Sequence, residues 1–442
     1  MVDPADENPS DHRRLGPVAR LFLKLGFTAF GGPAAHVAMM EDEVVRRRGW
    51  MTRGQFLDTV SAVNFIPGPN STELAIHVGQ TRAGLPGLVT AGACFILPAM
   101  LIVLPIAWAY TTHGPQGASP GASSRVADAL VGIKAATVAI VANALVRFAG
   151  TGVKDAFTAT LACLALAGAV LATIHPIPQS ELIILATAET AGAVYYRNRV
   201  TDTDARQPAA TQRVADALTV ETRRADDRPP PASPSPHLPL LLAPGLVATP
   251  FWTQSLQMSL FFLKVGATLF GSGYVLASYL DSGLVEHHRW LTRQELLDAI
   301  AVGQVTPGPL LTAATFIGYL LGHRNFGGGV PGGIVGGVLA TLAIFLPSFL
   351  FVAGLGHLLP RLRRNRFARG ALDGMNAAVV ALIATVTVWF AKAALFREGT
   401  WAVDWLAASV CAGSLVVLLT TRLNATWLIV AGAGIGLARG FV

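Results

Sequence analysis

The sequence is poor in charged residues. Asp, Glu, Lys and Arg make up only 13% of its 442 residues, whereas hydrophobic residues make up 52%. A soluble domain usually carries about 25% charged residues, so this deficit excludes an ordinary globular protein. Apolar runs such as residues 91–110 and 126–149 are near the roughly 20 residues that a helix needs to cross a bilayer. They are continuous rather than alternating, which favours membrane helices over a β-barrel.

Cysteine and catalytic motifs are scarce as well. Cys94, Cys163 and Cys411 form no CxxC or Cys/His cluster, so neither a disulfide framework nor a metal site is predicted. Walker A, GxSxG and HExxH patterns do not occur. We therefore expect no ATP hydrolysis, no other enzymatic activity and no cofactor. Residues 1–20 are polar and lack a signal-peptide pattern, so insertion by the protein's own helices is expected.

The net charge of +7 does not indicate a nucleic-acid partner. The Arg runs lack the interleaved aromatic residues of nucleic-acid grooves. They lie in short segments between apolar runs and in one polar linker, as the positive-inside bias of membrane proteins predicts. The lipid bilayer is therefore the expected environment.

An internal repeat is the strongest pattern in the chain. FLKLGFTAFGG at residues 22–32 matches FLKVGATLFGS at 262–272, and the segment at 50–69 matches that at 290–309. Both matches have an offset of 240 residues, and a later match of VGIKAATVAIV with DGMNAAVVALI has an offset of 242. We therefore divide the chain into a polar tail (1–17), a first repeat (18–196), a flexible linker (197–240) and a second repeat (241–442).

The repeats share one order of elements. Each begins with two interrupted apolar elements and continues with four uninterrupted spans. The expected spans are 85–110, 126–148, 156–174 and 181–196 in the first repeat, and 332–357, 370–390, 401–419 and 425–440 in the second.

Loop charges predict the orientation of the repeats. Residues 111–124 contain no Lys or Arg, whereas the equivalent residues 360–369 contain five Arg. Equivalent loops of opposite charge are expected on opposite sides of the membrane. The predicted fold is thus an all-α, multi-pass inner-membrane protein with two homologous, inverted repeats and broken or re-entrant helices. The basic segments at 46–48 and 289–293 fit this orientation incompletely, so the number of spans stays open.

Pro-Gly-Pro occurs inside an apolar run of both repeats. Proline removes a backbone donor, and in lipid such a break is tolerated where it lines a cavity or is buried in protein. Paired breaks in two inverted halves point to a substrate site, and a helix that restarts after the break would direct its amides at an anion. A simple helix kink is the alternative. The candidate substrate-binding residues at the breaks are Gly31, Gly32, His36, Asn64, Pro67, Gly68, Pro69, Asn70 and Ser71, together with Gln304, Thr306, Pro307, Gly308 and Pro309.

Charged residues near these breaks extend the candidate site. The equivalent residues Lys24 and Lys264 are predicted to contact an anion, although both lysines could instead reach the membrane surface. Glu73 has no acidic counterpart in the second repeat and is a candidate for proton coupling. Asp58 is a second coupling candidate, with the alternative that it pairs with Arg53 near a helix start capped by Thr52.

The repeated motifs resemble those of the chromate transporter family in its long, two-domain form. The resemblance rests on FGGPAAH at 30–36, the WMTRGQFLD segment, IPGP at 66–69 and their copies, and it covers nearly all of the chain except the tail and linker. It implies chromate export from the cytoplasm and chromate resistance, driven by the membrane potential or an ion gradient. The second repeat has GSGY in place of GGPAAH, so its break is a candidate for scaffold rather than ligand contact.

Three alternatives remain at this point. Sulfate is a tetrahedral dianion like chromate, so the chain could carry sulfate or another oxyanion. It could be a passive anion channel, or a membrane enzyme or non-transporting assembly partner. A homo-oligomer is also left open.

Overall fold

The computed structural model describes residues 14–30, 32–113, 123–175, 179–197, 250–270, 273–355, 365–396, 402–421 and 423–439. Within these ranges the regular secondary structure is helical apart from one isolated bridge between Phe396 and Val403. The predicted tail up to residue 13 and most of the predicted linker lie outside the described residues. So do residues 114–122 and 356–364, which hold most of the two loops whose charges predict the inversion, and inversion therefore stays a prediction.

The first repeat begins with broken elements and ends with long helices. Its elements are α1 (Leu15–Thr28), α2 (Pro33–Glu41), the π-helix η2 (Asp42–Arg47), α3 (Arg53–Val63), α4 (Ser71–His113), α5 (Ser123–Gly152), α6 (Ala156–Ile174) and α7 (Ser180–Arg197).

The second repeat follows the same order. Its elements are α9 (Pro250–Thr268), α10 (Leu276–Leu280), η5 (Asp281–His287), α11 (Arg293–Val305), η6 (Leu310–Thr312), α12 (Ala313–Leu320), η7 (Leu321–Asn325), α13 (Gly329–Leu355), α15 (Arg366–Leu395), α16 (Trp405–Thr420) and α17 (Ala425–Arg439).

Five helices are long and apolar enough to cross a membrane: Ser71–His113, Asp128–Gly152, Ala156–Ile174, Gly329–Gly354 and Phe367–Leu395. Two shorter apolar helices, Trp405–Thr420 and Ala425–Ala438, follow. Each of the eight expected uninterrupted spans coincides with a helix, which confirms the predicted all-α membrane architecture. The expected span at 85–110 is the longer part of α4, which begins earlier, at Ser71.

A helical hairpin follows the second break of each repeat. In α4 the helical conformation fails at Ala83 and Gly84, where Gly84 has a φ of 64°. The two arms then pack so closely that a Cβ on Gly79 would lie 2.3 Å from the carbonyl oxygen of Gly87. In the second repeat, α12 and η7 pack against α13 in the same way. Glycine at these contacts lets the backbones touch, as is common in membrane helix packing.

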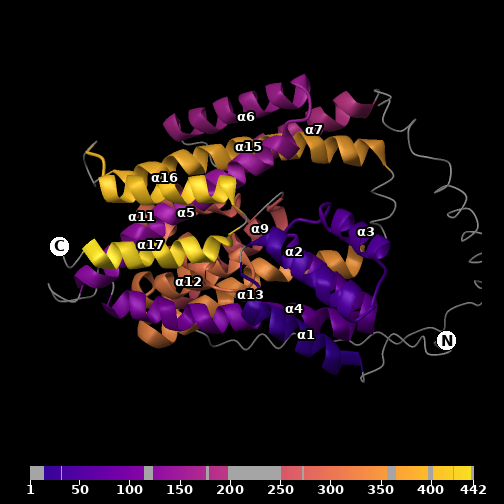
Figure 1. The fold of residues 1–442 in the computed structure, drawn as a ribbon, viewed down its shortest axis with the longest axis horizontal. Coiled ribbons are helices and arrows are strands. Elements are labelled where there is room, and N and C mark those ends of the chain that lie inside the picture. The colour runs from indigo at the N-terminus through magenta and orange to yellow at the C-terminus, as the bar shows by residue number, and fades with distance from the viewer. Residues whose placement is uncertain are drawn as a thin grey trace, which may run out of the picture.

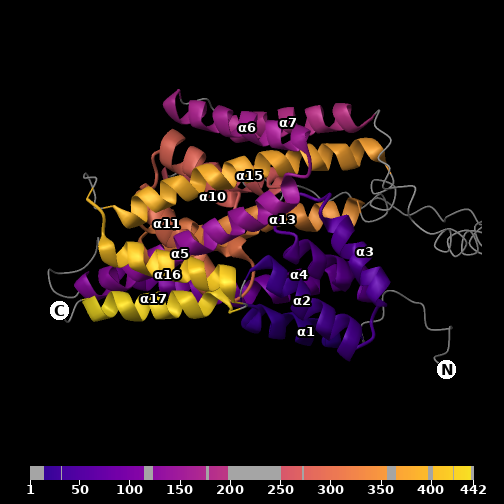
Figure 2. The same ribbon diagram turned by 45° about the horizontal axis from the view of Figure 1, so that its top comes forward.

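The repeats exchange their last two helices. α6 and α7 of the first repeat pack along α15 of the second, whereas α16 and α17 pack along α5 of the first (Figures 1 and 2). Glycines form close contacts at both interfaces. For example, a Cβ on Gly132 of α5 would lie 1.8 Å from the carbonyl oxygen of Gly432 in α17. Each repeat thus covers an apolar helix of the other, and the core is shared between them.

Candidate anion site where the broken elements cross

Two hydrogen bonds join the breaks of one repeat to those of the other. The Gly68 N–H donates to the Leu269 carbonyl oxygen at 2.6 Å, and the Gly308 N–H donates to the Ala29 carbonyl oxygen at 2.9 Å. Gly68 and Gly308 are equivalent, as are Ala29 and Leu269, which directly follow α1 and α9. Each Pro-Gly-Pro is therefore bonded to the first break of the other repeat.

The chemistry of Pro-Gly-Pro explains this pairing. Proline has no backbone N–H, so glycine supplies the single backbone donor of each triplet. Both triplets are buried, and a buried donor without a partner is strongly unfavourable in a membrane protein. Gly68 and Gly308 also have φ of 138° and 95°, a region that side chains disfavour. The predicted breaks are thus joined by these two hydrogen bonds. We call the region around the two hydrogen bonds the crossing.

His36 ties this crossing to the start of α4. Its imidazole Nε2 lies 3.0 Å from the Ala29 carbonyl oxygen, and its Nδ1 lies 3.3 Å from Ser71 Oγ. The side chain is buried against Phe95. Since both ring nitrogens have partners within the protein, His36 holds the backbone of the crossing in place. Its predicted contact with substrate is not tested by this arrangement.

Glu73 lies in the first turn of α4, beside the crossing. Its carboxylate is fully buried, and Ser348 of α13 donates a hydrogen bond to Oε1 at 2.5 Å. The backbone N–H groups of Asn70 and Glu73 also interact with this carboxylate. The amides at the start of α4 thus face a carboxyl group of the protein itself, at the place where the sequence predicts a bound anion.

Three buried polar atoms at these breaks have no hydrogen-bond partner among the described residues. They are Glu73 Oε2, Thr72 Oγ1 and Gln304 Nε2. Buried polar groups are normally paired, so each of these atoms has unused hydrogen-bonding capacity. Two of the three, Thr72 and Gln304, carry hydrogen-bond donors, which suits an oxyanion.

The two halves of the crossing differ in polarity. Ala313 stands where the first repeat has Glu73. The hydroxyls of Thr306 and Thr312 donate to backbone carbonyls of their own repeat. Gln304 interacts with Tyr274, whose hydroxyl oxygen would lie 3.6 Å from a Cβ on Gly32. The acidic group is therefore confined to the first repeat.

The remaining predicted residues at the breaks have varied surroundings. Asn70 Nδ2 donates to Asn64 Oδ1 at 3.0 Å, and Asn70 has a φ of 53°. Gly31 lies outside the described residues. The side chain of Asp58 is exposed on α3. Its role in coupling stays a prediction. Thr52 caps α3 through a capping box with Gln55, as expected.

Lys24 forms an ion pair rather than an open anion contact. Its Nζ lies 2.6 Å from Glu43 Oε1, and Arg47 and Arg48 lie 3.6 and 3.3 Å from the same carboxylate. The hydrogen bond from Lys24 holds the pKa of Glu43 below its ordinary value. The charge of Lys24 is thus already balanced in this structure.

A buried polar cluster between the repeats was not anticipated from the sequence. Asp298 Oδ1 lies 3.0 Å from Lys134 Nζ, and the Tyr110 hydroxyl donates to Oδ2 at 2.9 Å. This contact joins α4 and α5 to α11. The position of Lys134 inside a predicted span was the available signal, because intramembrane charge is costly and usually functional.

Arg293 does not pair with Asp298, although these residues are equivalent to Arg53 and Asp58 of the first repeat. Arg293 instead reaches Asp281 at 3.0 Å and Glu286 at 2.6 Å. It also lies 4.1 Å from the ring centroid of Trp389, so ring packing and two carboxylates direct it away from its own helix.

The fold and this crossing define a two-repeat membrane protein with paired broken helices, an architecture typical of secondary transporters. The chromate transporter family matches residues 17–193 and 256–437, which confirms both repeats. The chain belongs to the chromate transporter family.

Relatives with assigned names are similar over nearly the full length. A chromate transport protein of Cupriavidus metallidurans is 28% identical over 414 residues, covering 94% of this chain and 90% of the relative. A probable chromate transport protein of Synechococcus elongatus is 28% identical, covering 89% of this chain and 88% of its own. A chromate transport protein of Pseudomonas aeruginosa is 27% identical, and the match covers 84% of this chain and 80% of the relative. No solved structure matches the chain.

Proposed function

We propose that this protein exports chromate from the cytoplasm across the inner membrane by secondary active transport and confers chromate resistance. The observation that carries the proposal is the pair of hydrogen bonds from Gly68 and Gly308, each of which joins the Pro-Gly-Pro of one repeat to the other. Substrate sites of repeat-built transporters lie where discontinuous helices of the two halves meet. The names of the relatives support chromate as the substrate.

The substrate would bind at the crossing, beside the start of α4. Amides at a helix N-terminus stabilise negative charge, and Thr72 and Gln304 offer further donors. The carboxylate of Glu73 already faces those amides. An incoming dianion would therefore repel Glu73 unless this carboxylate is protonated or moves away, since both negative charges would share one low-dielectric site. This competition couples the substrate to a proton at Glu73.

Chromate flux into inverted membrane vesicles tests the proposal. Vesicles with the protein should accumulate chromate when an inside-positive potential is imposed, and excess sulfate should reduce uptake if the site recognises tetrahedral dianions generally. Control vesicles without the protein should show neither effect. Absence of uptake above the control would contradict chromate export.

The same measurement separates the alternative functions. Accumulation that never exceeds the electrochemical equilibrium set by the concentration gradient and the imposed potential would identify a passive channel. Sulfate uptake without chromate uptake would identify a carrier for another oxyanion.

A further inference from the structure

The equivalent residues Lys24 and Lys264 have different surroundings. Lys24 is balanced by Glu43 at 2.6 Å. The residue equivalent to Glu43 in the second repeat is Gly283. A Cβ there would lie 2.2 Å from the ring of Phe261, so no side chain fits at this position. Among the described residues, no carboxylate lies within ion-pairing distance of Lys264.

Lys264 instead lines a large cavity between α7, α9 and η5. The cavity has a volume of about 680 Å³, within the range of small-molecule sites. Leu260, Phe261 and Val265 form part of its apolar wall. The remaining wall is largely polar and includes Gln257, His287, His288 and Arg289. Lys264 and Arg289 are the cationic side chains of this wall, and the space that they line is larger than a tetrahedral oxyanion.

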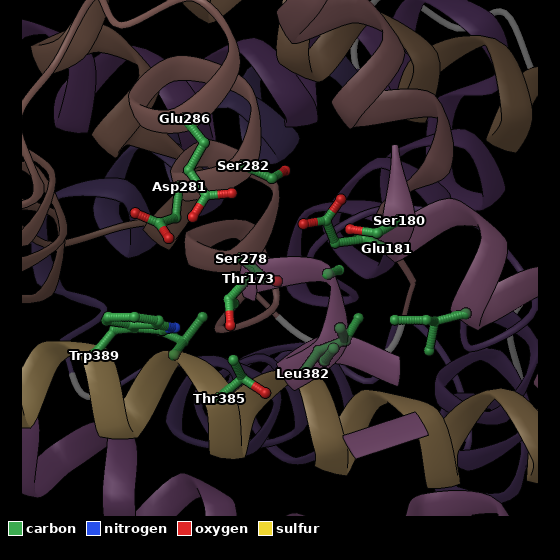
Figure 3. Close-up of a pocket in the computed structure, with 14 residues that line it drawn as sticks. Thr173, Ser180, Glu181, Ser278, Asp281, Ser282, Glu286, Leu382, Thr385 and Trp389 are labelled. Atoms are coloured by element: carbon green, nitrogen blue, oxygen red, sulfur yellow. The ribbon is translucent and has the colours of Figure 1, made fainter. Parts of the chain in front are cut away.

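Two acidic residues, Glu181 and Glu286, also line this cavity, and both have partners of their own. Glu286 is paired with Arg293 at 2.6 Å. Glu181 interacts with Ser282 and, over a longer distance, with Lys264. Figure 3 shows the carboxylate of Glu181 facing Ser282 across a small polar cavity. Glu181 is therefore the main negative charge that faces Lys264 and Arg289 in the large cavity. The two cations can thus also balance the charge of an added anion.

The large cavity lies close to the crossing along α9. Lys264 precedes Leu269 by five residues, which corresponds to about 7.5 Å along a helix. The carbonyl oxygen of Leu269 accepts the hydrogen bond from Gly68. The backbone of Lys264 is thus about one and a half helical turns from the crossing.

We propose that this cavity is a capture site for a tetrahedral oxyanion, held by Lys264, and that Lys24 is its structural counterpart without a role in binding. The capture site rests on the proposed transport function and adds a second anion position to the crossing. The absence of a carboxylate at Gly283 distinguishes the two lysines: Lys24 is paired directly with Glu43, whereas Lys264 has only the more distant Glu181. A lipid phosphate has the same chemistry as a free oxyanion, and the experiment distinguishes the two.

The test compares Lys264→Gln and Lys264→Arg with the matched variant Lys24→Gln in reconstituted vesicles. Lys264→Gln should raise the KM for chromate about tenfold, since a hydrogen-bonded charge is lost, whereas Lys264→Arg should restore most of the affinity. Lys24→Gln should leave the KM unchanged and have little effect on thermal stability, because Lys24 is half-exposed and Glu43 keeps its contacts with Arg47 and Arg48. An unchanged KM in Lys264→Gln, or an equal rise in both Gln variants, would overturn the capture site.

Lipid composition identifies the source of the anion. The effect of Lys264→Gln should be the same in vesicles of phosphatidylcholine alone and in vesicles that contain phosphatidylglycerol. An effect confined to the anionic vesicles would assign the cavity to a lipid headgroup and overturn capture of free oxyanion. Wild-type protein that moves no chromate or sulfate would refute the transport function itself, which is a different result from an unchanged KM.

Discussion

Glu73 is a buried acidic residue that the second repeat lacks. The side chain is fully buried, Ser348 hydrogen-bonds one oxygen, and the other oxygen has no partner among the described residues. The second repeat has Ala313 at this position. A group that exchanges a proton for an anion need occur only once in a transport pathway, and a buried carboxylate without a cation is suited to this exchange.

Substitution of Glu73 by Gln should separate coupling from binding. Gln keeps the size of the side chain and a group that can interact with Ser348, but it cannot ionise. We expect potential-driven chromate accumulation to fall to the level of control vesicles, while exchange of chromate across the membrane without a gradient persists. Ser348→Ala is the control, because it removes the hydrogen bond and keeps the carboxylate. Undiminished accumulation in Glu73→Gln would rule out coupling at this residue.

Gly68 is required for a steric reason that the structure makes explicit. A Cβ at this position would lie 1.8 Å from Glu73 Oε1, and the φ of 138° is unfavourable for any other residue. Gly68→Ala should therefore lower the free energy of unfolding by about 1–3 kcal/mol and abolish transport.

Thermal unfolding in detergent would measure the effect of Gly68→Ala. Gly16→Ala is the matched control, since a Cβ on Gly16 meets no atom within 4 Å, and it should leave both stability and transport unchanged. Equal stability of the two variants would show that the backbone at the crossing adapts to a side chain.

Residue-level prediction succeeded where a pattern was repeated and failed where a contact was not local. The Pro-Gly-Pro triplets and the cap at Thr52 were visible in the sequence because they depend on neighbouring residues. The partners of Lys24 and Asp298 were not, because Glu43 is 19 residues from Lys24 and Lys134 is far from Asp298 in the chain. Sequence spacing constrains pairs on one helix turn, but not pairs between packed elements.

At the scale of elements, the ion pair between Lys134 and Asp298 holds α5 against α11. Both side chains are largely buried, at 15% and 2% exposure. Removal of one partner from a buried pair leaves an uncompensated charge, and such changes cost about 3–5 kcal/mol. Lys134→Ala or Asp298→Ala should reduce the free energy of unfolding by this amount. The double variant should be less unstable than the sum of the two, because neither charge remains.

An exposed ion pair between the turn that follows α5 and helix α15 provides the comparison. Lys154 Nζ lies 2.5 Å from Asp373 Oδ1, with 52% and 26% exposure. Surface pairs contribute about 0–1 kcal/mol, so Lys154→Ala should have little effect in the same unfolding assay. Similar losses at the two sites would mean that the pair at Asp298 is hydrated rather than buried.

At the scale of the whole molecule, the repeats were predictable but their exchange of helices was not. Matching motifs at a constant offset identify duplication directly. Membrane helices such as α6 are apolar on every side, so their sequence does not indicate which face packs on protein and which faces lipid. The packing of α6 and α7 on α15, and of α16 and α17 on α5, required the structure.

This exchange predicts that neither repeat is stable alone. Without the second repeat, α6 and α7 would lose α15, and α5 would lose α16 and α17, which exposes the closely packed glycines of these helices to lipid. Fragments 1–220 and 221–442, divided within the predicted linker, should each be degraded when expressed singly. Expressed together, they should accumulate, co-purify and restore chromate flux, because the linker contributes no predicted contact to the shared core. A single fragment that accumulates as a monomer with normal thermal stability would show that each repeat folds on its own and that the helix exchange is not needed for folding.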